Sequence, residues 1–171
     1  MRLTTGIAVA IVCLAACVSD IRSRRIPNLL TFGAAVAAIL FHGLTGGVQG
    51  LGHAALGWVV GAALFFPLFA LGGMGAGDVK LMAAVGAWLG PAPAAWTALY
   101  AAIAGGAMAI GVALFRGYLR TAFRNIGHLL WSWWLAGVRP VPELTLDASR
   151  GPRLAYALPI TVGTMVTLWL R

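Results

Sequence analysis

The sequence has 171 residues, of which 61% are hydrophobic and 9% are charged, whereas a soluble domain carries about 25% charged residues. This composition excludes a water-soluble globule, a disordered chain and a disulfide-built secreted module, because so short a chain cannot bury that much apolar surface. Twelve Lys and Arg against four Asp and Glu give a net charge of +8, and the class that remains is a basic polytopic membrane protein.

Apolar runs bounded by glycine, proline or charge predict an all-α fold with six transmembrane helices in one domain, 1–171. The spans are expected at 3–19, 29–44, 51–71, 79–89, 94–115 and 154–170. The fourth is shorter than the roughly 20 residues of a full crossing. Its ends are therefore expected to lie deep in the protein.

The first span permits two interpretations. Arg2, the apolar stretch and Leu14-Ala-Ala-Cys17 are also typical of a lipoprotein signal that is cleaved before a lipidated cysteine. An uncleaved span is favoured, because cleavage would leave Arg22, Arg24 and Arg25 on the wrong side of the membrane.

The basic residues predict the orientation of the chain. If the loop after the first span is cytoplasmic and the spans alternate, two basic residues fall outside and ten inside: Arg22, Arg24, Arg25, Lys80, Arg116, Arg120, Arg124, Arg139, Arg150 and Arg153. This excess predicts an N-terminus outside the cytoplasm. It also assigns the positive charge to membrane orientation rather than to binding of nucleic acid.

Residues 116–136 differ in pattern from the spans. Polar side chains recur at every fourth position, and apolar and aromatic side chains cover much of the rest of the surface. The segment is predicted to be an amphipathic helix on the inner leaflet, with its arginines toward anionic lipid headgroups. A docking surface for a substrate is the alternative. Val138–Pro152, with Glu143 and Asp147, is expected to be a solvated loop.

Two acidic residues stand at predicted helix ends on the cytoplasmic side, Asp20 closing the first span and Asp78 opening the fourth. An ionisable residue there is expensive to bury and suggests a functional site. Two carboxyl groups that meet in a dry site tend to share one proton, so one can accept a proton from water while the other protonates the substrate. These are the requirements of aspartic peptide hydrolysis, without a metal or another cofactor. The alternatives are an ion pair of Asp20 with nearby arginines and an N-cap role for Asp78.

The helix dipoles predict how the proton is shared. Asp78 stands at a helix N-terminus, where negative charge is favoured, and Asp20 at a C-terminus, where it is disfavoured. Asp20 is therefore expected to hold the shared proton more often, and Asp78 to be ionised.

Residues beside the aspartates complete the candidate site. Gly75 and Gly77 permit unusual dihedral angles or the close approach of another chain. Pro27 and Asn28 start the second helix, where proline suits the first turn. Lys80 is expected to contact the substrate or to lower the pKa of a carboxyl group, or else to extend to the lipid headgroups.

These residues resemble the type IV prepilin peptidases, intramembrane aspartic proteases of the GxGD class. The resemblance is carried by Asp20, by Ile26-Pro27-Asn28 and by Gly75-Ala-Gly-Asp-Val-Lys80. Leu154-Ala-Tyr-Ala157 is similar to the motif at the start of the family's last helix, with Ala155 where proline usually precedes the tyrosine.

The resemblance implies that Asp20 and Asp78 hydrolyse the leader peptide of prepilins at the cytoplasmic face of the bacterial inner membrane, just before the hydrophobic helix of the prepilin. Larger members carry two C-x-x-C pairs in an N-terminal domain and also N-methylate their product. This sequence is similar in size to the short peptidases of tight-adherence (Flp) pilus systems, so no methyltransferase activity is expected. The expected partners are a prepilin and the lipid bilayer, and homo-oligomer formation stays open.

Two other functions compete with the peptidase. An acid-coupled transporter would use the same two aspartates as a proton relay, although the halves of the sequence show no matching broken helices. A catalytically silent assembly protein of the same fold is the third alternative.

Overall fold

The computed structural model describes residues 2–146 and 154–170, and every regular element in this part of the chain is helical. The all-α fold class is therefore confirmed for these residues. The elements are α1 (Arg2–Ser23), α2 (Asn28–Ala70), α3 (Ala76–Leu89), α4 (Pro91–Phe115), α5 (Leu119–Ala136), a 3-10 turn at Pro142–Leu144 and α6 (Ala157–Trp169).

Three of the helices, α1, α2 and α4, are long and apolar enough to cross a membrane, and α6 is a shorter apolar helix. Their outer faces carry large exposed apolar side chains, such as Ile7, Ile11, Leu40 and Ile103. A polytopic membrane protein buries such side chains in lipid. The predicted membrane class is therefore supported by the fold.

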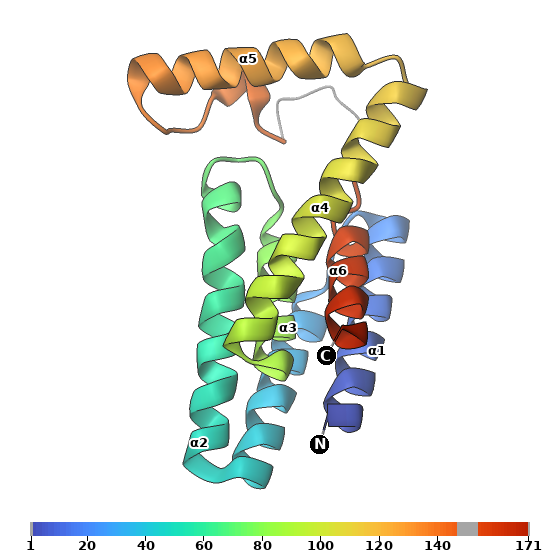
Figure 1. The fold of residues 1–171 in the computed structure, drawn as a ribbon, viewed down its shortest axis with the longest axis vertical. Helices are drawn as coiled ribbons and strands as arrows, with labels where there is room; N and C mark the ends of the chain where they lie inside the picture. Colours follow the sequence, from blue (N-terminus) through green and yellow to red (C-terminus); the bar gives the residue numbers. More distant parts are fainter. Residues whose placement is uncertain (1, 147–153, 171) are drawn as a thin grey trace.

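α2 contains both the second and the third predicted span. Gly47 has φ +58° and ψ −145° inside the helix, a conformation open to glycine and closed to residues with a Cβ atom. The chain reverses there, so that the two arms of α2 run antiparallel (Figure 1). The break that was expected over residues 45–50 is thus confined to the surroundings of one glycine.

α3 is enclosed by the other helices. All of Leu81–Leu89 is buried, and the helix packs against the second arm of α2 at Gly57–Gly86 and Gly61–Met82, where an added Cβ atom would meet backbone. Small residues permit such close helix packing. The short helix is therefore surrounded by protein, as its length predicted.

Several helix ends differ from the expected ones. α1 continues to Ser23, past Asp20. α3 begins at Ala76 with Gly75 as its N-cap residue, so the N-cap alternative for Asp78 is wrong. α4 begins at Pro91 rather than 94 because proline suits the first helical turn.

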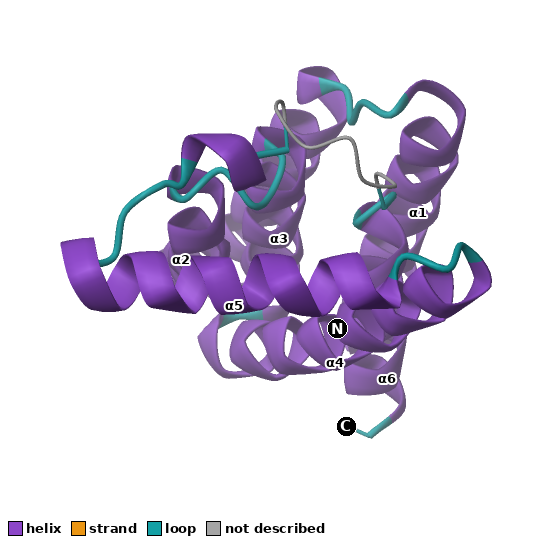
Figure 2. Ribbon diagram, turned by 90° about the horizontal axis from the view of Figure 1, so that it is seen from above, coloured by secondary structure: helices purple, strands orange, loops and turns teal. Residues whose placement is uncertain are grey.

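The segments that carry the predicted site residues lie at one end of the helix bundle. The C-terminal end of α1, the α2–α3 loop and the N-terminal end of α6 lie toward this end, and both chain termini lie toward the other (Figure 1). α5 crosses over the first end, as the view from above shows (Figure 2), and it has no buried residues. Its contact with lipid headgroups stays a prediction. Glu143 is exposed, as expected, while Asp147, Arg150, Arg153 and Arg171 lie outside the described residues.

Candidate active site

Two loops and the ends of three helices form a cavity of about 410 Å³ at this end of the bundle. Its lining includes both Asp20 and Asp78, and we call it the aspartate cavity. All seven predicted site residues line it: Asp20, Pro27, Asn28, Gly75, Gly77, Asp78 and Lys80. The remaining lining residues, Arg24, Arg25, Ile26 and Ala76, are their neighbours in sequence.

Asp20 lies in the last turns of α1 and is 8% exposed. Its Oδ2 accepts a hydrogen bond of 3.3 Å from the backbone N–H of Ala157, the first residue of α6. The positive end of the α6 dipole therefore faces Asp20.

Asp78 is half-buried in the first turn of α3, just before the predicted span 79–89. Burial raises the pKa of Asp78 above its ordinary value, and the nearby negative charge of Asp20 raises it further. A backbone hydrogen bond from Gly75 acts in the opposite direction. Asp78 is thus the member of the pair that favours the protonated form.

The raised pKa of Asp78 runs against the expectation that Asp78 is the ionised member of the pair. The sequence argument considered only the helix to which each aspartate belongs. Asp20 also faces the start of α6, a helix far away in the sequence, and Asp78 is desolvated despite its position at a helix N-terminus.

The two glycines before Asp78 act through close packing. A Cβ atom on Gly75 would lie 3.2 Å from Oδ2 of Asp78, and one on Gly77 would lie 3.3 Å from Cβ of Ile26. Gly75 has an ordinary extended conformation, with φ −76° and ψ 146°. Close approach, and not an unusual dihedral angle, is therefore what glycine provides at position 75.

Lys80 connects α3 with the first arm of α2. Its Nζ donates a hydrogen bond of 2.9 Å to Oδ1 of Asn28 and lies 5.3 Å from the ring centroid of Phe32. Both partners belong to the first arm of α2. This contact between α2 and α3 was not among the roles expected for Lys80.

The loop after α1 is held by serines that the sequence analysis did not select. Ser19 Oγ donates to the carbonyl oxygen of Arg25 at 2.8 Å, and Ser23 Oγ donates to that of Ser19 at 2.8 Å. The N–H of Arg24 donates to the carbonyl oxygen of Asp20 at 2.8 Å. These bonds fix the arginines beside the cavity. Serines near a helix end were the signal in the sequence that could have indicated these hydrogen bonds.

Tyr156 precedes α6 and also lies near the aspartates. Its ring packs edge-on to Phe65, with centroids 6.0 Å apart, and against Gly105. In the described part of the chain, no three His, Cys, Asp or Glu side chains group as a metal site would require.

Comparison with known proteins gives a consistent result. A family model described as the type IV leader peptidase family matches residues 7–110, a range that includes both aspartates. The chain is 32% identical over 125 residues to a prepilin leader peptidase/N-methyltransferase of Aeromonas hydrophila, covering 68% of this chain and 43% of that relative. A protein of the same name from Aeromonas salmonicida is 31% identical over 125 residues, with the same coverage. The chain thus spans less than half the length of the curated relatives it matches. No solved structure matches.

Proposed function

This chain belongs to the type IV leader peptidase family, and we propose that it is an intramembrane aspartic endopeptidase that cleaves the leader from type IV or Flp-type prepilins. The observation that carries the proposal is the aspartate cavity. Of the four acidic residues in the sequence, the two that lie 58 positions apart line one cavity together with glycines that leave room beside them.

The surroundings of the two carboxyl groups support a division of roles. Asp20, in its ionised form, takes a proton from a water molecule. At the same time, the oxygen of this water molecule attacks the scissile carbonyl carbon. Asp78, protonated, donates its proton to the carbonyl oxygen, which gives a neutral tetrahedral intermediate. Collapse of the intermediate breaks the C–N bond. The leaving nitrogen takes the proton now held by Asp20, and Asp78 recovers its own from the hydroxyl group.

The location of the site follows from the charge distribution. Arg24, Arg25 and Lys80 line the aspartate cavity, and basic residues collect on the cytoplasmic side of membrane proteins. Cleavage therefore takes place at the cytoplasmic face of the bacterial inner membrane, and the N-terminus lies outside. Residues 1–171 act as one integral membrane peptidase domain.

Co-expression with a prepilin of the same cell tests this function. Leader removal is expected for the wild type and is expected to be lost in both Asp20→Asn and Asp78→Asn. Glu143→Gln is the control, since Glu143 is exposed and lies outside the cavity. Leader removal that persists in both aspartate variants would contradict the proposal.

The same samples address the second activity in the relatives' names. We propose that this chain does not methylate its product. Mass spectrometry of the mature pilin is expected to give the mass of the cleaved chain without an added methyl group.

A further inference from the structure

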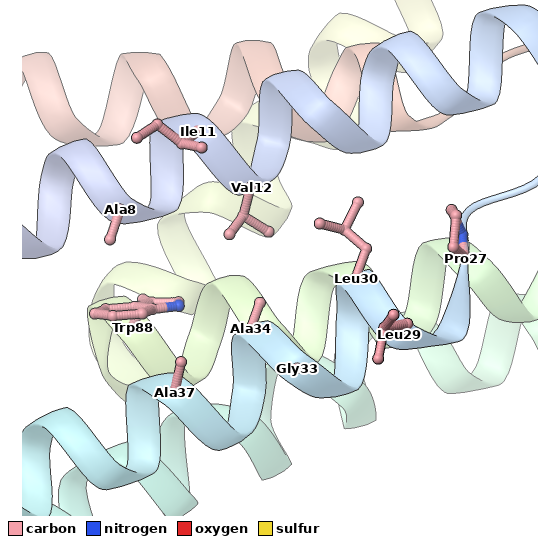
Figure 3. A pocket seen from close by; sticks show the side chains of 10 residues that line it. All are labelled: Ala8, Ile11, Val12, Pro27, Leu29, Leu30, Gly33, Ala34, Ala37 and Trp88. Atoms are coloured by element: carbon pink, nitrogen blue, oxygen red, sulfur yellow. The ribbon is translucent and has the colours of Figure 1, made fainter.

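An apolar groove of about 630 Å³ runs between α1 and the first arm of α2. Ala8 and Val12 of α1 face Leu30, Ala34 and Ala37 of α2 across it (Figure 3). At one end it reaches Pro27, which also lines the aspartate cavity. Pro27 therefore borders both the groove and the cavity.

Trp88 closes the groove at its other end. The side chain is 8% exposed, and its Nε1 is buried without a hydrogen-bond partner among the described residues. The ring is held by Phe41 and His42, with centroids 5.7 and 6.4 Å away. Figure 3 shows the nitrogen turned toward the space between Val12 and Ala34. A buried N–H group without an acceptor is unfavourable, and an occupant that supplied an acceptor would relieve this cost.

The α2 side of the groove suits a helix. Gly33, Ala34 and Ala37 are small, and an added Cβ atom at Gly33 would meet nothing within 4 Å. Such surfaces let the backbone of another helix approach closely within a membrane.

We propose that the groove binds the apolar helix that follows the leader in the prepilin, while the scissile bond enters the aspartate cavity past Pro27. This inference rests on the proposed peptidase function. A polypeptide fits both neighbouring spaces, extended in the polar cavity and helical in the apolar groove.

The other occupants fit less well. A lipid acyl chain would leave the polar aspartate cavity empty, and a second copy of this chain has no reason to continue into it. Ten residues of α3 separate Asp78 from Trp88, which corresponds to roughly 15 Å. The groove therefore holds about three helical turns of the prepilin next to the cleaved bond. Contact with Nε1 requires the side chains that cover it to separate.

Photo-crosslinking identifies the occupant. A benzophenone amino acid replaces Ile11, which lines the groove, in an Asp78→Asn chain co-expressed with a tagged prepilin. The same amino acid at Ile103, which is exposed on α4, is the control. An adduct with the prepilin from position 11 and none from 103 is expected. An adduct from position 11 with lipid alone, or with a second copy alone, overturns the proposal.

A filled groove provides the kinetic test. Gly33→Leu occupies the groove, and Gly106→Leu is its control, since an added Cβ atom has open space at both positions. Each variant is given the whole prepilin and a short peptide that spans the cleavage site without the apolar helix. Gly33→Leu is expected to lower the ratio of prepilin to peptide cleavage roughly tenfold, because the misplaced bond no longer meets the aspartates.

If the ratio of prepilin to peptide cleavage is equal in the two variants, the proposal that the groove binds the prepilin helix is overturned, and the peptidase function is not affected. A wild type that cleaves neither substrate contradicts the peptidase function instead. In that case, and if Gly33→Leu does not fold, the crosslinking result decides on the groove.

Discussion

The proposed division of roles between Asp20 and Asp78 depends on the helix ends around each carboxyl group. Asp20 accepts the N–H of Ala157 at the start of α6, which stabilises negative charge. Asp78 is desolvated beside Asp20, and its pKa is raised. The two carboxyl groups titrate as a pair, so these surroundings decide which member carries the proton more often.

Infrared spectroscopy at neutral pH tests this assignment. The band of a protonated carboxyl group is expected to weaken but not to vanish in Asp20→Asn, because burial still raises the pKa of Asp78 after the charge of Asp20 is removed. It is expected to disappear in Asp78→Asn, which removes the carboxyl group whose pKa is raised. Glu143→Gln should leave the spectrum unchanged, as the group is exposed. The reverse pattern, with the band lost only in Asp20→Asn, would restore the assignment made from the dipole of each aspartate's own helix.

At the scale of the elements, the position of Asp78 depends on how closely α3 approaches α2. Gly86 packs against the backbone of Gly57, with no room for a Cβ atom on either residue. Gly86→Ala is expected to lower the free energy of unfolding by about 2 kcal/mol, because the two helices must separate. Thermal denaturation in detergent measures the effect. Gly106→Ala is the control, since Gly106 has open space, and an equal change in both variants would show that α3 tolerates displacement.

The same contacts show which features of the helices could be predicted from the sequence and which could not. Hydropathy predicted the helices and the break between 29–44 and 51–71, because both are local properties of the chain. It could not place the reversal at Gly47, or the Gly57–Gly86 contact, among 23 glycines. Pro27, Gly75 and Asp78 were selected from local motifs and do line one cavity. The approach of Ala157 to Asp20 joins residues 137 positions apart, and no local pattern encodes it.

At the scale of the whole molecule, the direction of the chain in the membrane decides which compartment the aspartate cavity faces. Thr45 lies near the reversal of α2, toward the end of the bundle that holds the termini, whereas Glu143 follows α5 at the opposite end (Figure 1). Both residues are exposed. A single cysteine at each position, in a chain with Cys13 and Cys17 replaced by alanine, therefore reports on one side of the membrane.

Basic side chains near the cavity predict that the Glu143 side is cytoplasmic. A membrane-impermeant maleimide is expected to label Thr45→Cys in spheroplasts, and Glu143→Cys only after the membrane is opened. Labelling in the opposite order would place the aspartates on the outer face and would contradict the proposed cleavage at the cytoplasmic face.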